Sequence, residues 1–231
     1  GAFRFMDTRS RDSIGFADDG EEKVEHNILK MKADYEFSDS FKVRGMVGFL
    51  IRRAEQLNVE NYLRDSTGAK VWGGSSNTDM SIGGRTFQVK ASNFNVTTRD
   101  KQDLMLGLGA SGKLGAGWNY DAVLSSYIKL DDTFRSSDEN PSDPNYDKSG
   151  SLTQFQDTGW QLLDVKFNKN NFMSNANLKF EGGYHYDHAR METIKWSVPD
   201  WENDERDEGT FSSSIGGQTD THAVHTNVGW N

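Results

Sequence analysis

Four of the five histidines in this chain of 231 residues form two pairs with the same spacing. They are His185, His188, His222 and His225. We predict that the flanking segments pair as one antiparallel hairpin, with His185 opposite His225 and His188 opposite His222. Side chains directly opposed across two such strands lie about 4.5–5.5 Å apart, so each imidazole pair could share Zn²⁺ or Cu²⁺ with Asp187 or Asp220 nearby. The alternative is that these are polar surface or lumen residues without a metal.

Three acidic stretches offer carboxylate oxygens, which are the ligands that Ca²⁺ prefers. They cover residues 18–22, 138–143 and 200–208. None has the twelve-residue ligand spacing of an EF-hand. A solvated surface, or contact with lipopolysaccharide through divalent ions, is therefore the favoured interpretation. We predict no cofactor, with Ca²⁺ or Zn²⁺ as the alternative.

Aromatic and cationic side chains are the candidates for binding a small-molecule or oligosaccharide ligand. Tyr146, Trp196 and Trp201 lie in predicted loops and could stack on a sugar or an aromatic siderophore. Arg44 and Arg52 lie on the polar face of a predicted strand and could guide an anionic ligand. Packing anchors and ion pairs are the structural alternatives. No spacing in the chain supports a catalytic group, so an enzyme is not expected.

The elements that must position these residues are β-strands, because apolar and polar side chains alternate along them. The clearest case is 103–134, which predicts two long strands joined by a very short turn. Further strands are predicted at 3–5, 23–37, 41–51, 163–167, 176–187 and 221–231, with a small hairpin near 86–95. Short turns at 38–40, 114–117 and 168–175 alternate with long polar loops at 8–22, 54–100, 132–157 and 196–219.

Composition limits the class of protein. The net charge is -9, and this acidic balance argues against a nucleic-acid partner, which requires a basic surface. There are no cysteines, so disulfides, thiolate zinc sites and cysteine catalysis are excluded. No run approaches the ~18–20 apolar residues of a spanning helix. The first residues lack the features of a signal peptide, so we expect a mature protein, a fragment or a chain that is not exported.

These features together predict an all-β fold, an antiparallel transmembrane β-barrel of which the chain supplies about eight strands. Short turns on one side and long loops on the other are typical of such barrels, with the turns periplasmic and the loops extracellular. Half of each strand faces a polar lumen, so a transmembrane barrel is compatible with the low mean hydropathy of -0.77. The alternative is a soluble antiparallel sandwich or barrel whose apolar face forms its core.

Two segments resemble the barrel of TonB-dependent outer-membrane receptors. In those receptors an RD-containing loop precedes a strand of the form N-x-L-x-L-x-x-Y and then a short SD turn, and Arg11-Asp12-Ser13 through Val43 resembles that segment. The second segment, Gly112-Lys113-Leu114-Gly115-Ala116-Gly117-Trp118-Asn119-Tyr120-Asp121, is similar to another hairpin of the family. The resemblance covers most of the chain as a pattern of strands and turns. It contains no catalytic motif.

The resemblance implies a barrel of about 22 strands, closed by a plug domain, in the outer membrane of a Gram-negative cell. Such a receptor imports a scarce nutrient, such as a siderophore–iron complex, cobalamin, haem or an oligosaccharide. The expected partners are outer-membrane lipid, lipopolysaccharide, the ligand, and the TonB complex through the plug. Residues 1–231 would be an internal segment of the barrel, because the sequence contains no plug. The alternative is a complete eight-stranded surface barrel with a structural or adhesive role.

Overall fold

The computed structural model describes residues 2–6, 13–18, 21–38, 40–74 and 78–230. Side chains are described for Ala17 and, from residue 21 onward, for all of these residues except residue 82. Three sets of residues used above lie outside this part of the chain. They are Arg11 and Asp12 of the receptor-like segment, Asp19 and Gly20 of the first acidic stretch, and Asp39 of the predicted turn.

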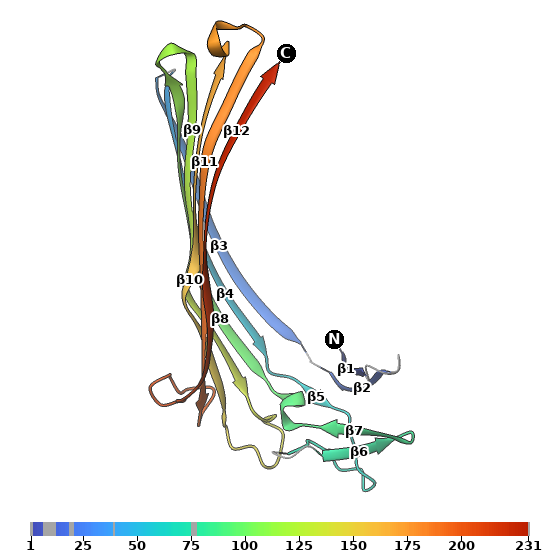
Figure 1. The fold of residues 1–231 in the computed structure, drawn as a ribbon. Helices are drawn as coiled ribbons and strands as arrows, with labels where there is room; N and C mark the ends of the chain where they lie inside the picture. Colours follow the sequence, from blue (N-terminus) through green and yellow to red (C-terminus); the bar gives the residue numbers. More distant parts are fainter. Residues whose placement is uncertain (1, 7–12, 19–20, 39, 75–77, 231) are drawn as a thin grey trace.

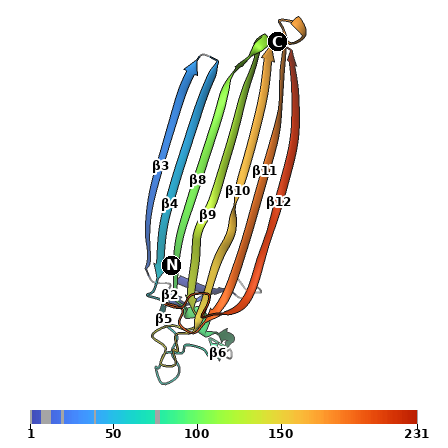
Figure 2. The same ribbon diagram turned by 90° about the vertical axis from the view of Figure 1, so that its left-hand side faces the viewer.

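A single antiparallel sheet of seven strands dominates the fold (Figures 1 and 2). In chain order the strands are β3 (Glu22–Ser38), β4 (Phe41–Gln56), β8 (Thr97–Leu114), β9 (Trp118–Ser137), β10 (Gly150–Asn170), β11 (Leu178–Val198) and β12 (Thr210–Trp230). Each strand pairs with the next of these seven along the chain, so the sheet is a simple up-and-down meander. Within the described residues, β3 and β12 are its two edges.

The all-β, antiparallel prediction is confirmed, but the strands are longer than predicted. They contain 16 to 21 residues, whereas strands of globular proteins usually contain about 5–6. The predicted loops at 132–157 and 196–219 are wrong at both ends, because β9, β10, β11 and β12 extend into them and leave only 138–149 and 199–209 as connections. Both faces of these strand extensions carry polar residues, so they have no apolar alternation to mark them.

The prediction of about eight strands in the sheet is also wrong, because the first predicted strand lies elsewhere. Strand β1 (Ala2–Met6) pairs with β2 (Ser13–Asp18), and β2 pairs with β5 (Glu60–Asn61) in a separate small sheet. Strand β2 lies inside the predicted loop 8–22.

The connection between β4 and β8 contains a second small unit. Its hairpin consists of β6 (Thr78–Ile82) and β7 (Arg85–Val89), so it begins earlier than the hairpin predicted near 86–95. A short 3-10 helix, η1 (Ala91–Phe94), follows this hairpin. No helix in the described part of the chain is long and apolar enough to cross a membrane.

Short and long connections lie at opposite ends of the sheet, as the sequence predicts (Figure 1). The short end holds the β3–β4 turn and two brief 3-10 segments, η2 (Gly115–Gly117) and η3 (Phe172–Ser174). The long end holds 57–96, 138–149 and 199–209. The strands therefore run the full distance between two chemically different ends.

The hydrophobic core lies at the long end, between the connections and the ends of β10 and β11. Its buried side chains are Ala17, Val59, Leu63, Trp72, Val89, Phe94, Val96, Leu152, Val198 and Trp201. Trp72 and Phe94 meet edge to face, with ring centroids 5.5 Å apart. The long connections are therefore packed structures that cap the strands.

Candidate functional site

One face of the large sheet is apolar across all seven strands. A single row of paired residues shows this, because each member lies directly opposite the next. The row is Tyr35, Val43, Ala110, Ala122, Val165, Tyr184 and Val224. We call the surface around this row the apolar band; it covers residues 29–37 on β3 and 224–230 on β12.

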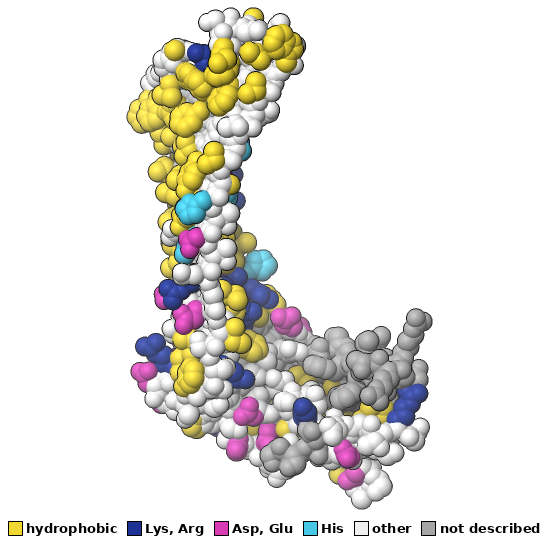
Figure 3. All heavy atoms as spheres, in the orientation of Figure 1, with side chains coloured by type: hydrophobic (Ala, Val, Ile, Leu, Met, Phe, Trp, Pro, Cys, Tyr) yellow, Lys and Arg dark blue, Asp and Glu magenta, His cyan; other side chains and the backbone are white. Residues whose placement is uncertain are grey.

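The apolar band is exposed, since no other element of the described chain covers it. Leu108 is 56% exposed, Leu124 49% and Val224 78%. Figure 3 shows hydrophobic side chains gathered over the upper part of the sheet, toward the short connections, with charged side chains below them. Soluble monomers rarely expose apolar surface over so many adjacent strands, so this surface is a candidate for contact with a lipid or a protein partner.

The band ends sharply toward the long connections. There the same face carries a row of polar residues that pair across five strands: Glu25, Arg53, Asp100, Thr133 and Gln154. Neighbouring charges are joined along the strands, with Lys23 Nζ 2.9 Å from Glu25 Oε1 and Arg53 Nε 2.8 Å from Glu55 Oε1. The face therefore changes from apolar to charged within a few residues.

The band also crosses the sheet obliquely. The row of pairs that starts at Leu29, where the band begins on β3, reaches β12 at Gln218, whereas the band on β12 begins at Val224. This shift of about six residues over about six strand spacings corresponds to a tilt of about 35°. On β3 the band is about 26 Å long, or about 22 Å at that tilt. Membrane barrels have tilts of ~35–45° and apolar bands of ~25 Å.

The opposite face is polar and joined by ion pairs between strands. Arg44 on β4 reaches across β8 to Asp121 on β9, with its Nη2 2.7 Å from Oδ2 and 2.8 Å from Oδ1. Gly109 lies beneath this side chain, and a Cβ there would overlap the guanidinium group. Arg52 lies 3.7 Å from Glu22. Both predicted ligand-guiding arginines are therefore engaged in ion pairs.

The predicted register of the histidine hairpin is wrong by two residues. His185 lies opposite Ala223 and His188 opposite Asp220, so the two histidine pairs are diagonal neighbours instead of directly opposed. A shift of two residues keeps the predicted faces, because side chains alternate with a period of two. The loop between β11 and β12 is shorter than predicted, and its polar sequence does not determine the register.

The histidines instead pair with carboxylates. His185 Nδ1 lies 2.8 Å from Asp164 Oδ1, and His188 Nδ1 lies 2.8 Å from Asp220 Oδ1. His222 contacts the Tyr184 hydroxyl at 2.7 Å, and the His225 ring lies against Gly183. Among the described residues no group of three or more histidine or acidic side chains could hold a metal ion. The structure therefore offers no support for the predicted metal site.

The predicted ligand-binding aromatics are part of the packing at the long end. The indole Nε1 of Trp201 donates to the Tyr146 hydroxyl at 2.7 Å, and Trp201 is only 2% exposed. Trp196 lies within β11 rather than in a loop, and both it and Tyr146 pack against the core. The Trp201 ring is therefore not free to stack on a ligand in this structure.

One acidic loop holds a carboxyl group in an unfavourable position. The pKa of Glu139 is raised by burial and, in addition, by the negative charges of Asp143, Asp147 and Asp138. Its Oε2 is buried without a hydrogen-bond partner among the described residues. A carboxyl group whose pKa is higher in the folded chain makes the free energy of unfolding fall as pH rises through that pKa.

Glu139→Gln is therefore expected to raise the free energy of unfolding by about a few tenths of a kcal/mol at pH values above the pKa of Glu139. The gain should disappear near pH 3, well below the ordinary carboxyl pKa of 4.5, where the group is protonated in the folded and unfolded chains. Thermal unfolding at pH 3 and pH 7 measures it. Glu202→Gln, at an exposed loop position, is the control; an equal gain in both variants would contradict this explanation.

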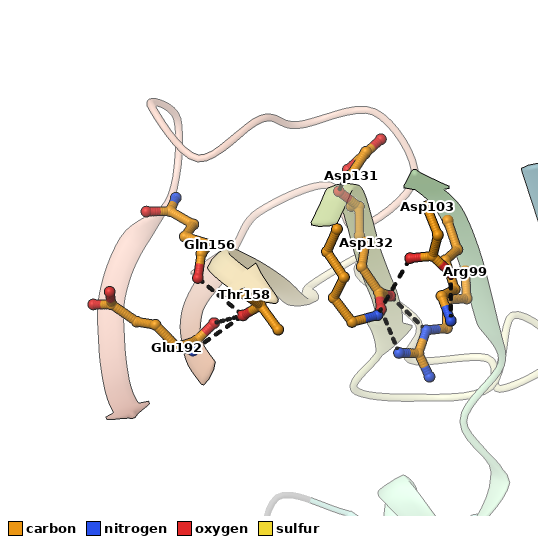
Figure 4. A network of polar contacts seen from close by, with 10 residues as sticks. Arg99, Asp103, Asp131, Asp132, Gln156, Thr158 and Glu192 are labelled. Carbon is orange, nitrogen blue, oxygen red and sulfur yellow. Dashed lines mark hydrogen bonds and ion pairs between the residues drawn. The ribbon is translucent and has the colours of Figure 1, made fainter. Parts of the chain in front are cut away.

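A further feature, not predicted from the sequence, is a break between β9 and β10. The two strands pair at Thr133 with Gln154 and again at Ile128 with Gly159, but the residues between these positions do not pair. In Figure 4, Asp131 and Asp132 lie on one side of the break and Gln156 and Thr158 on the other. The Thr158 hydroxyl donates to the Gln156 carbonyl at 3.0 Å and accepts from the Glu192 amide at 3.1 Å.

A buried cluster of charges lies beside the break, on the polar face. Asp132 accepts two hydrogen bonds from Arg99, at 2.7 and 2.8 Å, and pairs with Lys129. Asp103 lies 2.8 Å from Lys101 and is, like Asp132, 1% exposed. These charges join β8 to β9 beside the break, and removal of Asp132 would leave partly buried cations without their shared carboxylate.

Comparisons of the chain with models of known protein families and with curated protein sequences find no match. The interpretation of the sheet therefore rests on its geometry.

Proposed function

We propose that the seven-stranded sheet is part of the wall of an outer-membrane β-barrel, with the apolar band facing lipid and the polar face lining the lumen. The oblique apolar band carries this proposal. In a soluble sandwich the apolar face is expected to follow the rows of paired residues. A membrane instead places the apolar residues of all tilted strands at one depth, so the band runs obliquely to those rows. The extent of the band along the membrane normal and its abrupt change to charged residues agree with the thickness and the polar boundary of a hydrocarbon layer.

We infer further that the barrel is larger than this sheet. In the described part of the chain, β3 and β12 each lack a neighbour on their outer side, and a membrane does not tolerate unpaired backbone groups, so we infer that further strands close the barrel. Small residues such as Gly107 and Ser125 on the polar face suit a wide lumen. With the resemblance to TonB-dependent receptors, this supports a barrel that binds a scarce nutrient and imports it with energy from the TonB complex.

The intact mass of the native protein, extracted from membranes with detergent, tests this proposal. A mass several tens of kilodaltons above the 26.0 kDa of this chain, with recovery only in detergent, is expected for a large receptor barrel. A native mass near 26.0 kDa would exclude the large barrel, and recovery without detergent would exclude the membrane location.

A further inference from the structure

The break between β9 and β10 opens a cavity in the sheet. Asp157 adopts a positive φ of 44°, and the bulge around it separates β10 from β9 over four residues of each strand. The resulting cavity has a volume of about 730 Å³ and is lined by residues from both faces of the sheet. This volume lies in the ~300–1,000 Å³ range of small-molecule sites.

Three glutamines of β10 line the cavity on the face that carries the apolar band. They are Gln154, Gln156 and Gln161. Their side-chain amides make no hydrogen bond to any other described residue. Each amide offers two donor hydrogens and an acceptor oxygen, so the three together present a polar lining that is free to bind a ligand.

Charged groups complete the polar lining. Asp131 enters from β9, Arg190 from β11 and Arg206 from the 199–209 connection. The Arg190 guanidinium is held by Glu192 at 3.0 Å and by Asp157 at 3.4 Å, which orients its remaining donors. The cavity therefore combines fixed donors and acceptors without a strong excess of either charge.

An aromatic surface adds an apolar contact. Trp160 lines the cavity from the polar face, on the other side of the sheet from the glutamines, is 41% exposed, and stacks with Tyr127 at a centroid distance of 6.4 Å and an interplanar angle of 13°. A ligand that fills the opening between the two faces therefore needs hydroxyl groups that donate and accept toward the glutamines, and a C–H face that packs on the Trp160 ring. A saccharide has both properties.

On β10 the cavity lies just outside the apolar band. Leu163 is the last band residue of β10, and the next residue on that face is Gln161, opposite His188. If the proposed function is correct, this level is that of the lipid headgroups on the side of the long connections. We propose that the β9–β10 break binds a saccharide, either the sugar headgroup of a glycolipid or a free oligosaccharide.

Binding of two probes to the protein purified in detergent tests this site. The probes are purified lipopolysaccharide and the lipid-free core oligosaccharide released from it, measured by titration calorimetry. The double variant Gln154→Leu/Gln156→Leu is expected to bind about tenfold more weakly, since it removes two hydrogen-bonding side chains. Gln102→Leu, on the same face of β8 and outside the cavity, is the control and is expected to change binding less than about twofold.

The two probes separate the possible sources of the sugar. Binding of lipopolysaccharide alone, weakened by the double variant, identifies a glycolipid site, and binding of both probes identifies a site for the saccharide itself. Binding of neither probe, or equal binding by the double variant and wild type, would overturn the proposal. If the protein proves soluble without detergent but binds the free oligosaccharide, the saccharide site stands and the membrane proposal fails.

Discussion

An arginine at position 124 is expected to destabilise the protein by about 2–4 kcal/mol in a lipid bilayer, which is the cost of a cationic side chain at the midplane on the lipid-facing side of a barrel. Leu124 lies at the middle of the apolar band on β9 and is 49% exposed. In water, a substitution at so exposed a position would change the free energy of unfolding by only about ±0.5 kcal/mol. Urea titration of the folded protein in lipid vesicles measures the difference.

The adjacent residue supplies the control for this prediction. Ser125 lies on the same strand at the same depth, but its side chain is on the polar face. Ser125→Arg is expected to cost less than about 1 kcal/mol, because the charge enters a polar lumen. Equal costs for Leu124→Arg and Ser125→Arg would contradict the assignment of the two faces.

Loss of the Asp132 charge is expected to destabilise the sheet by about 2–3 kcal/mol. Asp132→Asn keeps the shape of the side chain but leaves Arg99 and Lys129 without their shared carboxylate. Breaking a fully buried pair costs about 3–5 kcal/mol, and the partial exposure of Arg99, at 34%, reduces this cost. Equilibrium unfolding in denaturant measures it.

Asp131→Asn is the matched control for the charge cluster. Asp131 is the preceding residue, and among the described residues its carboxylate accepts one side-chain hydrogen bond, from the Thr133 hydroxyl at 2.9 Å. Its replacement is expected to change stability by less than about 0.5 kcal/mol. If both aspartates cost the same, the buried cluster does not stabilise the pairing of β8 with β9.

The faces of the strands could be predicted from the sequence because the apolar band imposes a period of two. Leu104, Leu106 and Leu108 lie on one face, as predicted, and so do the paired residues of β9 and β4. The same signal locates the short turns, since apolar alternation continues almost to the ends of the strands there. A single buried or lipid-facing surface is enough to produce this pattern.

The ends of the strands beyond the band could not be predicted. From Asp131 to Ser137 the chain has polar residues on both faces, so its sequence resembles a loop although it continues β9. The register of β11 with β12 was misjudged for the same reason. Between Glu192 and Thr219 few apolar side chains alternate, and a shift of two residues keeps every face unchanged.

The candidate site depends on features that single residues do not reveal. Gln154 and Gln156 look like ordinary polar positions, and only the missing pairs between β9 and β10 place them at a cavity. A tryptophan in a polar loop, such as Trp201, is typical of a ligand-stacking residue, yet this side chain is buried by contacts with segments far away in the chain. Pairing and packing over long sequence distances, rather than local pattern, decide both outcomes.

The environment of two adjacent side chains tests the membrane proposal most directly. The chain contains no cysteine, so Leu124→Cys and Ser125→Cys each give one site for a nitroxide spin label without further changes. In protein reconstituted in lipid bilayers, we expect the label at 124 to collide with oxygen, which dissolves in lipid, and the label at 125 with a water-soluble nickel complex. Preference for the nickel complex at both positions would contradict the proposal that the apolar band faces lipid.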